Sequence, residues 1–200
     1  MKAAVPEDLL ALLGIQVSPG TVAAASRILE QTMPSLEAML ESELSAADRE
    51  DYFTLGSRDV SPVLRLHTGF VDSSSPVVLT NVGSVVDSSD YVLDPYRGVV
   101  HVNGTLVTGT RCLSVSYSSG FPESTDIPGL LEELPSGVVG AALSLAAAYY
   151  LLNPNNAPRQ KASHLSSIGI SGFESSARRA VEPFQRPRAT VIWPDYSVRA

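Results

Sequence analysis

The sequence predicts an α+β protein: a small helical bundle with an inserted antiparallel β region, a hairpin-rich sandwich or barrel, followed by an extended C-terminal arm. Three observations predict this class. Apolar residues recur at helical spacing up to residue 45 and alternate along short runs in residues 50–120. An apolar run follows at 135–152, and the chain then becomes rich in Ser, Arg and Pro. We therefore expect a body at 1–154 and an arm at 155–200.

Two helices are predicted within residues 6–45. Pro6 fits the first turn of a helix, and Gly14 is typical of the residue after its end. A longer helix follows, in which we expect a kink or restart at Pro34 with Thr32 as its cap. The apolar side chains of this longer helix step by three or four residues: Val22, Ala25, Leu29, Met33, Leu36, Leu40 and Leu44.

A further helix is predicted at 135–152. Its residues are apolar nearly all round, which is typical of a helix buried in a bundle or against neighbouring subunits. The apolar stretch is shorter than the about 20 residues that a membrane helix needs. Acidic residues that follow Pro6 also make the N-terminus unlike a secretory signal, so no membrane partner is expected.

Seven short runs of β-branched and aromatic residues predict the strands of the β region. The clearest local pattern is Val99–Val107, in which two alternating runs are joined by Asn103 and Gly104. Asn-Gly is the preferred pair for a type I′ turn, so we expect a hairpin here. The runs are 52–55, 63–67, 77–80, 91–93, 99–102, 106–108 and 112–117.

No motif for catalysis or for a cofactor stands out. The chain has no G-x-S-x-G nucleophile elbow, no phosphate-binding G-x-x-x-x-G-K-[ST] loop and no strand-linked G-x-G-x-x-G. Asp87, Asp90 and Asp94 lack the spacing of a calcium loop and are interpreted as turn residues. Cys112, the only cysteine, has no partner for a disulfide or a zinc site. We expect no enzyme activity, no cofactor and no metal.

Charge is distributed unevenly along the chain. Residues 1–150 hold 7 basic and 18 acidic residues, whereas residues 151–200 hold 7 basic and 3 acidic ones. An acidic body of this kind repels nucleic acid, while a basic arm attracts an acidic partner. Clustered basic residues with aromatics on one face, the pattern of sequence-specific DNA binding, are absent from the β region.

The arm combines arginines with aromatic residues, the types that dominate binding hot spots. We interpret it as an arm that docks on a partner protein; a solvated end without a partner is the alternative. The candidate docking residues are Arg178, Arg179, Phe184, Arg186, Arg188, Trp193 and Tyr196.

One stretch, with the order of the elements, resembles the head–tail connector (head-completion adaptor) proteins of tailed bacteriophages. It begins with Asp90–Val102, which contains D-Y-x-L-D and G-x-V-x-V patterns. It continues with Leu113–Phe121, Ile127-Pro128 and an Ala-rich helix that ends in Tyr149-Tyr150. The resemblance covers roughly residues 18–152. The longer β region and the tail after Asn153 depart from compact members of the family.

The resemblance implies a structural virion protein without a catalytic site, made in the host cytoplasm. It would form a homo-oligomeric ring under the portal protein, extend the DNA channel and provide the docking platform for the tail or a second adaptor. Packaged DNA would pass close to it without specific contacts. An acidic channel wall would suit that role, because it makes few salt-dependent phosphate contacts.

A second hypothesis comes from a different class of protein. The chain would be a β-rich tail-associated or ligand-binding module that contacts its ligand through Ser-rich loops at 73–75 and 84–89. Carbohydrate-binding faces usually stack Trp or Tyr on the sugar, and the β region has no Trp. We therefore favour the adaptor.

Overall fold

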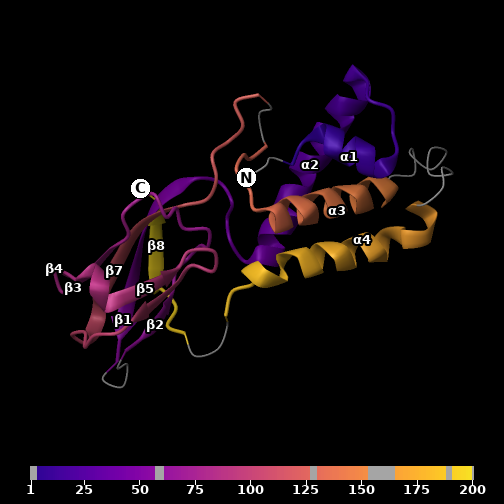
Figure 1. Ribbon diagram of the computed structural model, residues 1–200. Helices are drawn as coiled ribbons and strands as arrows, with labels where there is room; N and C mark the ends of the chain where they lie inside the picture. Colours follow the sequence, from indigo (N-terminus) through magenta and orange to yellow (C-terminus); the bar gives the residue numbers. More distant parts are fainter. Residues whose placement is uncertain (1–3, 57–60, 127–129, 153–164, 188–190, 200) are drawn as a thin grey trace. The chain divides into compact units, whose positions relative to one another are not determined.

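The computed structural model describes residues 4–56, 61–126, 130–152, 165–187 and 191–199 (Figure 1). Two compact units emerge, and the chain passes between them three times. The helical unit comprises Met1–Leu40 and Phe121–Pro183, and the β unit comprises Glu41–Gly120 and Phe184–Ala200. The predicted α+β class, with a β region inserted between helices, is confirmed. The described residues from 165 onward belong partly to the helical unit and partly to the β unit, and the division into a body and an arm stays a prediction.

Helix α1, Pro6–Leu13, begins and ends where the sequence predicts. Gly14 caps it in the left-handed conformation, with φ 65°, and its N–H reaches the carbonyl of Ala11 at 3.1 Å. Leu9 and Leu10 are buried on the inner side of the helix. Glycine adopts this conformation without steric cost, which explains why the helix stops here.

Helix α2, Pro19–Leu40, ends earlier than its apolar pattern suggests and continues through Pro34. Thr32 is not a cap: its side chain is buried within the helix and donates to the carbonyl of Leu29 at 2.7 Å. Beyond Leu40 the chain enters the β unit, where Leu44 is fully buried. The last apolar step of the pattern therefore belongs to a different core.

Helix α3, Ser136–Leu152, matches the predicted helix and is buried on most of its circumference. Helix α4, Leu165–Val181, packs along it (Figure 1) and lies in the stretch expected to be an extended arm. Its buried residues Phe173, Ala177 and Val181 recur every four positions, which is helical spacing. This pattern is short and lies among Ser, Gly and Arg, so it is easily missed in the sequence.

The β unit contains two antiparallel sheets. One has the order β4-β3-β7-β1-β8 and the other the order β2-β6-β5. Their core is formed by residues such as Phe53, Leu64 and Val115, which are fully buried. The strands are β1 Ala47–Leu55, β2 Val63–Arg65, β3 Val78–Asn81, β4 Ser84–Val85, β5 Tyr91–Asp94, β6 Val99–Val102, β7 Gly109–Ser119 and β8 Tyr196–Arg199.

The hairpin predicted at Asn103 and Gly104 is wrong. Strand β6 pairs with β2 on one side and β5 on the other, so neither edge is open to residues 105–107. A turn with positive φ at both central residues occurs instead at Val82 and Gly83, with φ 49° and 81°, between β3 and β4. The Asn-Gly pair has the right local chemistry, but strand pairing decides where the turn forms.

Gly98 lies in the turn between β5 and β6 and has φ 59°. A Cβ here would collide with the backbone carbonyl oxygen of Thr68. Gly83 also has positive φ, at 81°, but open space surrounds the place of its Cβ. An alanine at Gly83 would therefore suffer backbone strain alone, whereas an alanine at Gly98 would suffer both backbone strain and a steric clash.

We predict that Gly98→Ala lowers the free energy of unfolding of the β unit by more than about 3 kcal/mol, since both strain and a backbone clash result. The matched variant Gly83→Ala should cost about 1–2 kcal/mol, because only the strain applies. Urea unfolding followed by the fluorescence of Trp193, the single tryptophan, measures both. Equal losses in the two variants would contradict the predicted clash.

Candidate functional site

The candidate docking residues of the arm fall in two places. Arg178 and Arg179 lie on α4 in the helical unit, and the other described ones belong to the β unit. Arg188 lies outside the described residues. Within the described part of the chain, no group of three or more His, Cys, Asp or Glu side chains could hold a metal ion. No described helix is long and apolar enough to cross a membrane.

Arg178 and Arg179 are exposed in the last turn of α4. Basic side chains at this end of a helix are stabilised by the negative end of its dipole. The neighbouring Ala177 and Val181 are buried, so the helix packs through one side and presents the two arginines on another. Their exposure leaves both side chains accessible, and their docking on a partner stays a prediction.

Arg186 is placed differently, because only 7% of it is exposed. Its guanidinium group donates hydrogen bonds to backbone carbonyls: to His67 at 2.7 Å, to Arg97 at 3.0 Å, and also to Leu66 and Glu41. Burial, with a smaller contribution from the nearby Arg65, lowers the pKa of Arg186 to about 10. The side chain therefore stays protonated at neutral pH inside a cage of carbonyl dipoles.

A buried carboxylate contributes to the electrostatics of the arginine cage. Asp51 is fully buried and favours the charged form of Arg186. Its Oδ2 accepts from the His67 N–H at 2.5 Å and from the Tyr117 hydroxyl at 2.9 Å. Burial and this carboxylate raise the pKa of Tyr117 far above its usual range, so the phenol stays neutral and acts as a donor. Opposite buried charges partly offset the cost of removing each from water.

Phe184, two residues before Arg186, packs into an aromatic cluster. Its ring centroid lies 5.7 Å from that of Phe70 and 5.7 Å from that of Tyr96. The rings of Phe70 and Tyr96 meet edge to face, with centroids 6.5 Å apart. Such arrangements stabilise aromatic pairs beyond the area that they bury. The packing of the Phe184 ring therefore holds the chain in place two residues before Arg186.

Arg65 connects the next part of the arm to the β unit. Only 2% of this residue is exposed, and its guanidinium forms an ion pair with Glu41 at 2.7 Å and donates to the Pro187 carbonyl at 3.1 Å. The guanidinium carbon lies 3.8 Å from the ring centre of Trp193, a cation–π contact. The Arg65 N–H also donates to the Ile192 carbonyl at 2.9 Å.

The end of the described chain is strand β8, which pairs with β1. The rings of Tyr52 and Tyr196 are stacked, with centroids 4.6 Å apart, and Arg111 lies over Tyr196 at 4.4 Å. Asp195 adds a backbone hydrogen bond to the Tyr52 carbonyl and accepts from the Thr54 hydroxyl. The end of the described chain thus adds an edge strand to the five-stranded sheet, next to β1.

The described residues 184–187 and 191–199 form what we call the C-terminal strap, a segment bound to the β unit of its own chain. Whether it also binds a partner stays a prediction. Sequence reasoning missed the residues that receive the strap, chiefly Arg65, Glu41 and Asp51. Arg65 stands within the apolar run 63–66, and a charged residue in such a run was the one available signal.

We predict that Arg186→Ala lowers the free energy of unfolding of the β unit by about 3 kcal/mol or more, because several buried carbonyls lose their donor at once. The double variant Arg178→Ala/Arg179→Ala should change it by less than about 0.5 kcal/mol, since both side chains are exposed. Urea unfolding followed by Trp193 fluorescence tests this directly, because that ring lies on the strap. Similar losses in the two variants would show that Arg186 is not the anchor.

No protein-family model matches the chain, and no curated protein matches it either. Solved structures that the chain matches include the virion of a native gene transfer agent (GTA) particle, with 16% identity and a TM-score of 0.47, covering 92% of this chain and 90% of that chain. The neck of an empty GTA particle, computed with C6 symmetry, has 17% identity, a TM-score of 0.47 and the same coverage. The neck of a native GTA particle, computed with C12 symmetry, has 17% identity, a TM-score of 0.45 and 94% coverage of both chains.

Proposed function

We propose that the chain is a structural virion protein of the head-to-tail neck. It forms a homo-oligomeric ring under the portal protein, extends the DNA channel and provides the docking platform for the tail or a second adaptor.

The observation that supports this proposal most is the position of the segments that resemble the phage connector family. Residues 90–102 comprise the last residue of the short 3-10 helix η1, Ser88–Asp90, and the β5–β6 hairpin. Residues 113–121 include the end of β7, and the Ala-rich run forms α3. Gly98, within the G-x-V-x-V pattern, is required by the turn of that hairpin. The family-like stretches therefore coincide with regular elements, and one of their residues, Gly98, stands where the turn requires a glycine.

The charge of the chain fits a protein that lies beside packaged DNA without gripping it. The 18 acidic residues among the first 150 outnumber the 7 basic ones. Several of the basic side chains are committed to internal contacts: Arg65 and Arg49 are buried and paired with Glu41 and Glu43. A surface of this kind offers few contacts to DNA phosphates. The affinity for DNA, and its dependence on salt, rises with the number of such contacts.

The exposed pair Arg178 and Arg179 is the basic element of the arm that we assign to docking on a portal or neighbouring subunit. Trp193 and Tyr196 keep 52% and 37% of their surface exposed although they contact the β unit. Partly exposed aromatic residues beside arginines are typical of interface anchors. The docking role therefore rests on two separate pairs, Arg178 and Arg179 on the helical unit and Trp193 and Tyr196 on the β unit, rather than on the buried Arg186.

We predict that the purified chain, alone or on addition of portal rings, assembles into closed rings whose population grows with concentration. Native mass spectrometry over a concentration series gives the subunit number, and negative-stain images show whether the species are closed. A chain that remains monomeric at every concentration and also fails to join portal rings would contradict the proposal. Arg178→Ala/Arg179→Ala, which should fold normally, separates portal docking from assembly of the ring itself.

A further inference from the structure

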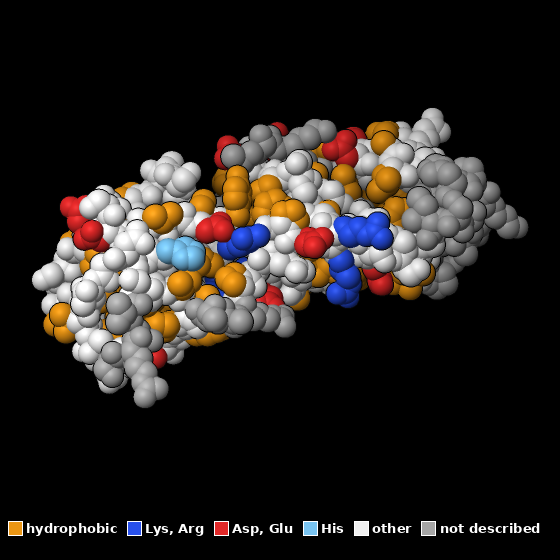
Figure 2. Space-filling view, turned by 60° about the horizontal axis from the view of Figure 1, so that its bottom comes forward, with side chains coloured by type: hydrophobic (Ala, Val, Ile, Leu, Met, Phe, Trp, Pro, Cys, Tyr) orange, Lys and Arg blue, Asp and Glu red, His pale blue; other side chains and the backbone are white. Residues whose placement is uncertain are grey.

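Hydrophobic side chains reach the surface at several points (Figure 2), and the three most exposed large ones among the described residues lie close together in the fold. Val85, Val82 and Val107 are 71%, 62% and 60% exposed. Val82 is in the β3–β4 turn and Val85 on β4. Val107 is held beside this hairpin because its N–H and carbonyl both bond to the Asn81 side chain, at 2.8 and 3.1 Å. We call these three residues the valine knob.

The residues at and just after β4 place a carboxylate close to the knob in the sequence. Val86 packs partly buried against the core of the β unit, whereas Val85 and Asp87 on either side of it are exposed. Asp87 is exposed and accepts a hydrogen bond from the Ser89 N–H at 2.9 Å. That bond holds the pKa of the Asp87 carboxyl below its usual range. The knob therefore has a negative charge close to it in the sequence.

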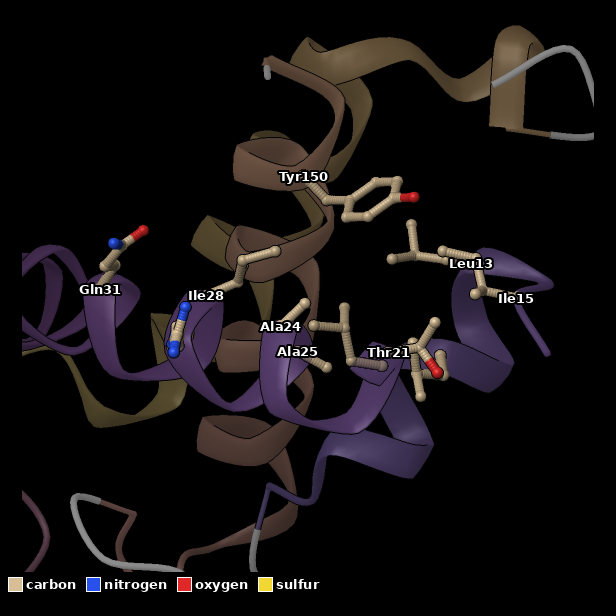
Figure 3. Close-up of a pocket in the computed structure, with 11 residues that line it drawn as sticks. Leu13, Ile15, Thr21, Ala24, Ala25, Ile28, Gln31 and Tyr150 are labelled. Atoms are coloured by element: carbon tan, nitrogen blue, oxygen red, sulfur yellow. The ribbon is translucent and has the colours of Figure 1, made fainter. Parts of the chain in front are cut away.

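A groove of about 260 Å³, lined by both aliphatic and polar residues, lies in the helical unit between α1, α2 and α3 (Figure 3). Leu13, Ile15 and Ile28 line it, and Tyr150 reaches across from α3. A cavity of about 150 Å³ already holds a molecule of the size of benzene, so the groove has room for the isopropyl groups of valines. The aliphatic side chains of the groove offer a contact surface to the three valines, which are exposed in their own chain.

The lining of this groove includes one cationic side chain. Arg27 is an exposed residue of the lining, next to Gln31 one turn further along α2. Arg27 forms no ion pair with another described residue, whereas Arg49, Arg65 and Arg97 each form one. A groove with aliphatic side chains and a cation in its lining is complementary to an apolar knob with a carboxylate close to it.

We propose that the valine knob of one copy inserts into the groove of a second copy, with Asp87 facing Arg27. This inference rests on the proposed function, because it names the contact from which the ring is built. The knob and the groove are different surfaces of the same chain, so the contact is head-to-tail. It leaves a free groove on the copy that supplies the knob and a free knob on the copy that supplies the groove. Contacts of this type generate closed rings when the rotation between copies closes.

Disulfide trapping between two different chains tests the contact without a possible reaction inside one chain. In a Cys112→Ser background, a Gln31→Cys protein is mixed with a Val85→Cys protein that carries a mass tag, and the mixture is mildly oxidised. We expect a covalent heterodimer, because disulfides require Cα atoms within about 7 Å. The control mixture uses Val92→Cys, a residue of β5 that is 58% exposed but lies on the other sheet, and should give no such product.

Each outcome has a definite meaning. A heterodimer with Val85→Cys but not with Val92→Cys supports the contact. Closed rings without this heterodimer overturn the contact and leave the ring in place. The heterodimer without closed rings supports the contact and contradicts the ring. If the mixture gives no product and the double variant Gln31→Cys/Val85→Cys closes a disulfide within one chain, the contact is internal and the inference fails.

A charge exchange tests the polar part of the contact. Arg27→Glu and Asp87→Lys should each weaken self-association, and the double variant should recover most of it, because the opposite charges face each other again. Asp87→Asn retains a capping side chain and serves as the folding control. Val85→Asp should weaken association about tenfold or more, and Val92→Asp should not. Additive losses in the double variant would overturn the pairing of Arg27 with Asp87.

Discussion

The β unit depends on one buried cation. Arg186 carries its charge into a position that is 7% exposed, where the guanidinium replaces its water shell with carbonyl oxygens from three separated parts of the chain: 41, 66–67 and 97. A charge without such partners would be costly to bury. These carbonyls in turn need a donor, so the loops that carry them and the strap that brings Arg186 stabilise one another. The last residues of the chain therefore complete a unit that begins at Glu41.

The same arrangement explains the mixed role of the C-terminal residues. Phe184, Arg186 and the β8 strand hold the strap in its own chain, whereas Trp193 and Tyr196 remain partly exposed on its surface. Arg178 and Arg179 precede the strap and stay on α4. A segment anchored at several points presents its exposed side chains in a fixed geometry, which lowers the entropic cost of binding a partner.

Sequence patterns predict the elements whose cause is local. Helix α1 follows from a proline at its start and Gly14 at its end, and α3 from an uninterrupted apolar run. The strands β5 and β6 follow from alternation. The Asn103-Gly104 hairpin fails although its chemistry is correct, because β6 already has a strand on each side. Pairing partners are distant in sequence, and no local pattern reports which edge is occupied.

From its residues alone the chain specifies its α+β class, the order of most elements, its acidic body and the set of arginines and aromatics near its end. The fold determines what those residues do. Arg186 and Arg178 are of the same type and eight positions apart, yet one lies in a carbonyl cage and the other faces solvent. Burial, charge pairing and backbone carbonyl acceptors come from segments such as residues 41, 65–67 and 97, and only the three-dimensional packing of the chain brings these segments to one place.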